Sequence, residues 1–133
     1  RRSSDLSGGE ISRVMLAVKT VLADEEDTPT LIFDEIDTGI SGITAGKVGD
    51  RLRLIGKSRQ VICITHLPQI AATADHHFLI RKKAEGTSVR TDVEMLDEAA
   101  SVEELARLLG GANVTERVME SAKELKELAK CER

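Results

Sequence analysis

Leu31-Ile32-Phe33-Asp34-Glu35 is the stretch of sequence that decides the fold. Three consecutive apolar residues are typical of a strand that is buried on both faces of a parallel sheet. Apolar residues then recur at helical spacing between residues 45 and 55, and Val61-Ile62-Cys63-Ile64 is a second apolar run. A strand, a helix and a second strand in this order predict a parallel α/β unit with a right-handed crossover.

A helix is predicted before this unit, directly after Leu6-Ser7-Gly8-Gly9-Glu10. Its apolar residues recur three or four positions apart, as they do on one face of an α-helix. The acidic run at residues 24–27 and Pro29 would end it. The apolar stripe consists of Ile11, Val14, Met15, Val18, Val21 and Leu22.

The pattern changes in the second half of the chain. Phe78-Leu79-Ile80 and the alternating residues 88–95 flank Glu85-Gly86, and this arrangement predicts an antiparallel hairpin. Ser101-Val102-Glu103-Glu104 predicts a capping box at the start of a helix, and Gly110-Gly111 predicts the end of that helix. A last helix, starting near Thr115, is predicted from its apolar stripe of Val118, Ala122, Leu125 and Ala129.

The predicted fold class is therefore α/β, with a partial parallel sheet flanked by helices, a β-hairpin and C-terminal helices. Two parallel strands do not make a stable sheet alone, so we expect the remaining strands to come from residues that precede Arg1. A short helix is also expected from Pro68 to Ala74.

Composition narrows the possible functions. Hydrophobic residues make up 41% and charged residues 32% of the 133 residues, which is too apolar for a disordered chain. The net charge of -4 and the shortness of the basic cluster Arg81-Lys82-Lys83 give no sign of a DNA-binding surface. No apolar stretch approaches the ~20 residues that span a membrane, so no membrane partner is expected. The two cysteines, Cys63 and Cys131, give no disulfide framework and favour a reducing cytosol.

Asp34 and Glu35 form an acidic pair at the carboxyl end of the first strand. Ligands of open α/β sheets gather at this edge. A first carboxylate can hold Mg²⁺, and a second can orient the water that attacks a phosphoryl group. Acidic pairs at strand ends are common, however, and such a pair alone does not establish a site.

Ser7-Gly8-Gly9-Glu10 opens the first helix. Ser7 can cap the helix and Glu10 can complete a capping box, which is the ordinary structural reading. The two glycines also leave the first backbone N–H groups uncovered, and a helix N-terminus of this kind can bind an anion.

Thr65-His66 ends the second apolar run, at the same edge of the sheet as the acidic pair. A lone histidine there is more often structural than functional.

Taken together, the order and spacing of these motifs resemble the ABC-type ATPases of the P-loop NTPase class. The resemblance identifies a signature motif, a Walker B motif with its catalytic glutamate, and a switch histidine. It implies that Asp34 holds Mg²⁺, that Glu35 orients the attacking water and that His66 senses the γ-phosphate of ATP. It further implies contacts in trans, to ATP bound by the opposite subunit, from Ser7, Gly8, Gly9 and Glu10.

Longer stretches are similar to the RecN family of SMC-like ABC ATPases. They are residues 34–42, residues 65–78 and residues 104–111. Many ABC proteins have an aspartate in the dimer-interface loop where this chain has Ser41, so the role of that aspartate cannot be carried over. Asp37 is the other polar candidate in this loop for a contact across a dimer.

The family resemblance implies that residues 1–133 are the C-terminal half of an ABC ATPase head. No Walker A sequence occurs in them, so we expect it in an N-terminal lobe, joined through a coiled coil. The expected partners are that lobe, a second copy bound through ATP, and DNA contacted by the full-length protein. The expected function is ATP hydrolysis in recombinational double-strand break repair, in the bacterial cytoplasm at the nucleoid.

Two other functions fit parts of the sequence. The chain could be a non-catalytic interaction fragment, because it lacks a Walker A motif and by itself should be inactive. It could also be the ATPase subunit of a transporter. The stretch Asp37-Thr38-Gly39 speaks against a transporter, because transporter ATPases usually have a proline-containing segment after the catalytic glutamate.

Overall fold

Strands β1 (Thr30–Phe33) and β2 (Gln60–Cys63) lie side by side and parallel, as the two apolar runs predict. Ile32 pairs with Ile62, and Phe33 pairs with Cys63. These observations come from a computed structural model, which describes residues 8–21, 28–86 and 88–131. The described residues divide after Thr73 into two units, and each is described by itself.

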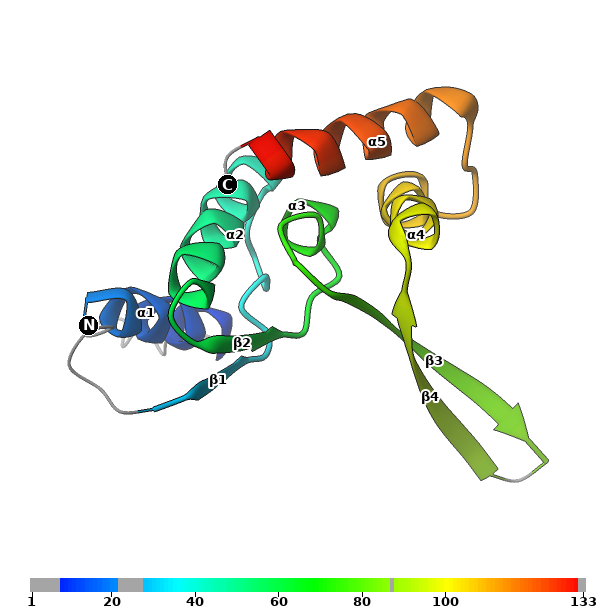
Figure 1. The fold of residues 1–133 in the computed structure, drawn as a ribbon. Helices are drawn as coiled ribbons and strands as arrows, with labels where there is room; N and C mark the ends of the chain where they lie inside the picture. Colours follow the sequence, from blue (N-terminus) through cyan, green and yellow to red (C-terminus); the bar gives the residue numbers. More distant parts are fainter. Residues whose placement is uncertain (1–7, 22–27, 87, 132–133) are drawn as a thin grey trace, which may run out of the picture. The chain divides into compact units, whose positions relative to one another are not determined.

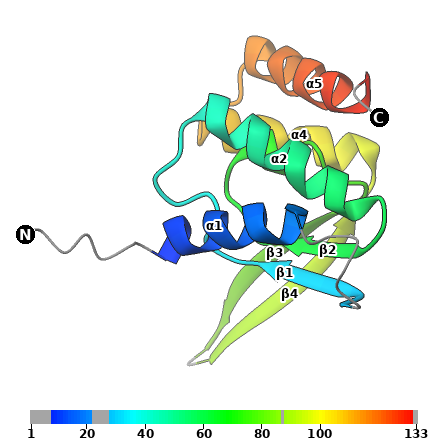
Figure 2. The same ribbon diagram turned by 90° about the vertical axis from the view of Figure 1, so that its left-hand side faces the viewer.

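The first unit contains three helices beside the parallel strands: α1 (Gly8–Val21), α2 (Gly42–Gly56) and α3 (Pro68–Ala71). Helices α1 and α2 lie on the same side of the two strands (Figures 1 and 2). Helix α2 buries the apolar face that its sequence predicts. The core between helices and strands consists of Leu16, Leu31, Phe33, Ile36, Ala45, Val48, Leu52, Ile55 and Ile70.

The opposite face of the β1–β2 sheet is exposed, which corrects the expectation of strands buried on both faces. Ile32 is 66% exposed, and Ile62 and Ile64 are 44% and 46% exposed. Successive side chains of a strand point to opposite faces, and the helices cover only one of them. Among the described residues, each strand therefore buries apolar side chains on only one face of the sheet.

The second unit begins with a long antiparallel hairpin of β3 (His77–Glu85) and β4 (Ser88–Leu96). One face of the hairpin carries ion pairs from Arg81 to Glu94 and from Lys83 to Asp92. Two helices follow, α4 (Glu98–Gly110) and α5 (Glu116–Cys131). The hairpin and both helices were predicted from the sequence, although the strands extend further than the apolar residues suggested.

The start of α4 differs from the predicted capping box. The helix begins three residues earlier than Ser101, because Asp97 is the N-cap and its Oδ1 accepts a hydrogen bond of 2.8 Å from the Ala100 amide. Ser101 lies inside the helix, where its hydroxyl contacts His77 Nδ1 at 2.9 Å. Glu104, the other half of the predicted box, binds Arg107 instead. The predicted C-terminus is confirmed, since Gly111 caps the helix with a φ of 62°.

No helix in the described part of the chain is long and apolar enough to cross a membrane.

Candidate functional site

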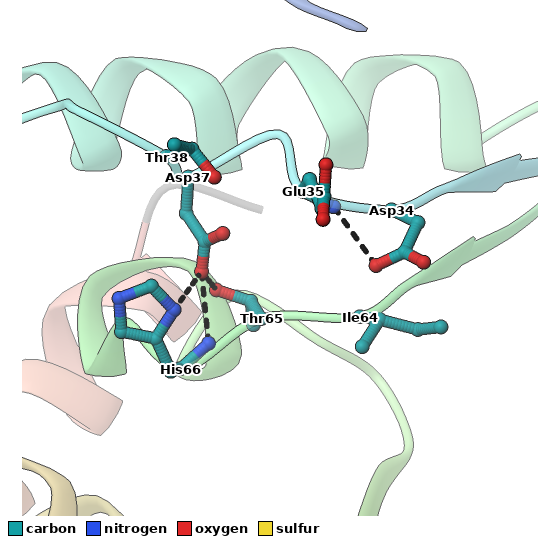
Figure 3. Close-up of a pocket in the computed structure, with 7 residues that line it drawn as sticks. All are labelled: Asp34, Glu35, Asp37, Thr38, Ile64, Thr65 and His66. Atoms are coloured by element: carbon teal, nitrogen blue, oxygen red, sulfur yellow. Dashed lines mark hydrogen bonds and ion pairs between the residues drawn. The ribbon is translucent and has the colours of Figure 1, made fainter. Parts of the chain in front are cut away.

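An open hollow of about 250 Å³ lies where the two parallel strands end. Asp34 and Glu35 directly follow β1, and Ile64, Thr65 and His66 directly follow β2. Because the strands are parallel, both segments leave the sheet at the same edge, as the sequence predicts (Figure 3). The hollow is lined by Asp34, Glu35, Asp37, Thr38, Ile64, Thr65 and His66.

Glu35 stands on a backbone that side chains rarely adopt. Its φ of 55° is in the left-handed region, and it is the one non-glycine residue with a positive φ among those that the structure describes. Such a conformation costs on the order of 1 kcal/mol or more and is concentrated at functional sites. The Glu35 amide donates a hydrogen bond of 2.9 Å to Asp34 Oδ1, which restricts the Asp34 side chain (Figure 3). Both side chains are exposed to the hollow.

Asp37 is the buried carboxylate of the site, with its side chain 4% exposed. Its Oδ2 accepts hydrogen bonds from Thr65 Oγ1 at 2.6 Å and from the His66 amide at 2.8 Å. Nδ1 of the His66 ring lies 2.9 Å from the same oxygen. Figure 3 shows these three contacts converging on one atom from the segment after β2. The loop after β1 and the segment after β2 are thereby joined.

These contacts control the charge on Asp37. Burial by itself would raise the pKa of the Asp37 carboxyl. The hydrogen bonds from Thr65 and from the His66 amide, together with the nearby His66 ring, outweigh burial and lower the pKa below its ordinary value. Asp37 is therefore a carboxylate at neutral pH, although little of it meets solvent.

The backbone of His66 is hydrogen-bonded, whereas its side chain is exposed to solvent. Its amide and Nδ1 are both engaged by Asp37, yet the side chain is 73% exposed. Thr65 supports the same turn, because its Oγ1 also accepts a hydrogen bond of 3.0 Å from the Leu67 amide. The ring is thus attached at one nitrogen and accessible elsewhere.

Arg13 is a site residue that the sequence analysis missed. From α1 its Nη1 donates hydrogen bonds to the carbonyl oxygens of Ile36, at 3.3 Å, and Thr38, at 2.7 Å. These carbonyls belong to the loop that also carries Asp37, so the helix that follows the predicted signature motif contacts the loop after β1. No pattern in the sequence marks Arg13, because it lies outside the apolar stripe of this helix.

The remaining predicted residues are placed as follows. Gly8, Gly9 and Glu10 form the first turn of α1, with Glu10 exposed, and Ser7 lies outside the described residues. Ser41 occupies the N-cap position of α2 with an exposed side chain that makes no capping hydrogen bond. The structure describes one chain, so the contacts in trans and the dimer-interface role of Asp37 and Ser41 stay predictions.

The oxygen atoms at the end of β1 suit a hard cation such as Mg²⁺. Among the described residues, no group of three or more His, Cys, Asp or Glu side chains forms a metal cage. Magnesium is usually held by one or two carboxylates, with phosphate and water oxygens completing the shell. The exposed carboxylate of Asp34 fits that mode of binding.

The chain has relatives among known proteins. It is 49% identical over 119 residues to the DNA repair protein RecN of Vibrio cholerae and 49% identical over 123 residues to that of Halalkalibacterium halodurans. It is 43% identical over 119 residues to RecN of Bacillus subtilis. The chain is thus similar to a part of each of these RecN proteins. The predicted resemblance is confirmed. No protein-family model matches the chain.

These alignments cover 90% to 92% of the chain but only 21% to 22% of each RecN protein. The chain therefore spans about a fifth of the length of the RecN relatives that it matches.

A solved structure supports the fold independently. The chain resembles a protein from structural work on ATP-driven dimerization and DNA-stimulated activation of SMC ATPases, with a TM-score of 0.57 and 24% identity. The match covers 77% of this chain and 62% of that protein. The chain accordingly shares the fold of the matched part of that protein, and the predicted α/β fold class is confirmed.

The strand after the acidic pair also carries a thiol. Burial, and then the nearby carboxylates of Asp37 and Asp34, raise the pKa of Cys63 to about 12. The Cys63 side chain packs against the core of the first unit. Cys63 is only partly buried, so the prediction of a small buried apolar residue in the second apolar run is confirmed in part.

Proposed function

We propose that this chain is the C-terminal half of the head of a RecN-type, SMC-like protein, which binds and hydrolyses ATP in double-strand break repair. One observation carries the proposal: Asp34, Glu35 and His66 line a single hollow at the ends of two adjacent parallel strands. One edge of the sheet therefore holds a carboxylate that can bind a cation, a carboxylate that can orient water and a histidine that can contact a phosphate.

Each residue has a proposed role in that reaction. Asp34 holds the metal through an exposed carboxylate. Glu35 accepts a hydrogen bond from the attacking water and aligns it with the γ-phosphorus. His66 contacts the γ-phosphate. When bound, Mg²⁺ would neutralise charge that develops on the phosphate oxygens. The N-terminus of α1, with Ser7, Gly8, Gly9 and Glu10, would contact the γ-phosphate of ATP held by a second subunit.

The wider setting belongs to the same proposal. The Walker A lobe lies in another part of the full-length protein, and two heads dimerise around ATP, with Asp37 and Ser41 in the interface loop. The full-length protein carries the DNA-binding surface and works in the bacterial cytoplasm. RecN relatives and the SMC ATPase fold support this setting.

The test is Glu35→Gln in the full-length protein. Glutamine keeps the shape of the side chain but is a much poorer acceptor for the proton of the attacking water. We expect kcat for ATP to fall by at least about 100-fold, with ATP binding retained and the ATP-bound dimer longer-lived. Turnover is measured with and without double-stranded DNA, and dimer lifetime by size-exclusion chromatography.

The matched control is Glu103→Gln, which makes the same change at an exposed position of α4 that does not line the hollow. It should hydrolyse ATP at the wild-type rate. Wild-type turnover by Glu35→Gln itself would overturn the assignment.

A further inference from the structure

Two hydrogen bonds and one close ionic contact meet at Oδ2 of Asp37. The Thr65 hydroxyl and the His66 amide donate the hydrogen bonds, at 2.6 and 2.8 Å, and Nδ1 of the His66 ring lies 2.9 Å from the same oxygen. Two of the three belong to His66, so a single carboxylate oxygen fixes both the backbone and the ring of that residue. A contact at the backbone alone would leave the ring free to rotate about χ1.

The contact is strong because the carboxylate is buried. The Asp37 side chain is 4% exposed. Hydrogen bonds to an ionised acceptor are about twice as strong as those between neutral groups. A buried carboxylate that lost these donors would leave its charge without compensation, and that loss would be costly. The arrangement therefore favours one orientation of the Thr65-His66 segment.

The contact also decides where the ring carries its proton. In a neutral imidazole one nitrogen donates and the other accepts, and a carboxylate beside one nitrogen holds the proton there. Nδ1 lies 2.9 Å from Asp37 Oδ2, so the carboxylate favours the neutral tautomer that has its proton on Nδ1 and presents Nε2 as an acceptor. The exposed ring can then take a proton or a donor at Nε2 without losing its attachment.

We propose that Asp37 is a positioning residue for His66: through Oδ2 it sets the orientation and the tautomer of the ring that serves ATP turnover. This assigns Asp37 a task within its own subunit, beyond the interface role considered above. The inference rests on the proposed ATPase function.

The loop is well placed for this task, because it is held on both sides. Arg13 binds the Ile36 and Thr38 carbonyls, which flank Asp37 in the chain. Asp37 in turn binds the segment after β2. The carboxylate therefore acts from a fixed backbone.

The first measurement needs no variant. In full-length protein labelled with nitrogen-15 at histidine, the His66 ring signals are identified by their loss in His66→Ala. At about pH 8, where an ordinary histidine is neutral, they should show the proton on Nδ1. In Asp37→Asn, which keeps the shape but removes the charge, they should shift towards the Nε2–H form. A wild-type ring protonated on Nε2, or signals unchanged in Asp37→Asn, would overturn the proposal.

The second measurement is a double-mutant cycle on ATP turnover. Asp37→Asn should lower kcat by roughly 10- to 100-fold, with KM for ATP little changed. In the His66→Ala background the same substitution should have no further effect, because the residue through which it acts is gone. Asp50→Asn, an exposed aspartate of α2, is the matched control and should leave kcat unchanged. Additive losses of kcat would instead mean that Asp37 acts by another route.

The two measurements separate the two proposals. If the wild-type protein hydrolyses no ATP, or Glu35→Gln turns over normally, the proposed function fails, and the ring signals still decide whether Asp37 sets the tautomer. If Glu35→Gln is inactive but the cycle is additive, the ATPase assignment stands and the role of Asp37 is refuted.

Discussion

Two carboxylates that are two residues apart in the sequence, Glu35 and Asp37, have opposite surroundings in the site. Glu35 is exposed on a left-handed backbone, whereas Asp37 is buried, accepts two hydrogen bonds and lies 2.9 Å from the His66 ring. An exposed carboxylate can meet a substrate or water, and a buried one can hold another residue in place. The pattern Asp-Glu-Ile-Asp therefore contains residues with different tasks.

The reactivity of Cys63 gives a prediction at the scale of one residue. Its pKa of about 12 leaves almost no thiolate at pH 8, and the thiolate is the form that reacts. We expect Cys63 to be alkylated by iodoacetamide at least about 100-fold more slowly than an ordinary exposed thiol. The rate is followed by mass spectrometry of the peptide that contains Cys63. Cys131 is exposed and serves as the internal comparison. Similar rates for the two cysteines would contradict the burial of Cys63.

At the scale of elements, the crossing of α2 and α3 depends on a glycine. A Cβ added at Gly49 would lie 2.8 Å from Thr73 Cγ2 and 3.3 Å from the Gln69 carbonyl oxygen. Thr73 cannot turn away freely, because its hydroxyl donates a hydrogen bond of 2.7 Å to the Ile70 carbonyl. The two helices therefore approach each other as closely as a residue without a side chain allows.

Gly49→Ala should destabilise the protein by about 1–3 kcal/mol, because the added methyl group overpacks this crossing. The matched variant is Gly46→Ala in the same helix, where nothing lies within 4 Å of the added Cβ. That change should stabilise by up to about 1 kcal/mol, since alanine is the better helix former. Urea unfolding monitored by circular dichroism measures both. Equal effects of the two substitutions would show that the helices do not cross this closely.

The types of the elements followed from sequence periodicity, but the buried face did not always follow. In α1 the predicted stripe residues Ile11, Val14, Met15 and Val18 are exposed, and Leu16 is buried instead. The ends of the elements did not always follow. Both Asp97 and Ser101 are good caps. In the structure Asp97 makes the capping hydrogen bond, and the Ser101 hydroxyl contacts His77. The proximity of Asp34, Glu35 and His66 could be predicted, because parallel strands end at the same edge of the sheet. The Asp37 and Arg13 contacts join residues more than 20 positions apart and have no periodic signal.

At the scale of the whole molecule, the hollow lacks what a triphosphate needs. None of the seven residues that line it is Lys or Arg, and three are acidic. The chain has a net charge of -4 and no Walker A sequence. Phosphate groups would meet repulsion here unless cations from another part of the protein, or Mg²⁺, compensate for it.

We therefore expect the 133 residues by themselves to show no ATP turnover and no micromolar ATP binding in the presence of Mg²⁺. Isothermal titration calorimetry and a phosphate-release assay test this, with the full-length protein as the positive control. Folding of the isolated residues is checked first by circular dichroism. Tight ATP binding by the folded fragment would show that the site is complete without the predicted Walker A lobe.

The backbone of Glu35 has a consequence for how this protein could change over generations or in a laboratory selection. Glycine adopts a φ near 55° without penalty, and asparagine adopts it more easily than glutamate. Replacing Glu35 by either residue would relieve local strain while deleting the carboxylate proposed to align water. Selection for heat resistance alone would therefore favour inactive variants at this position. Glutamate is retained only where activity is also selected.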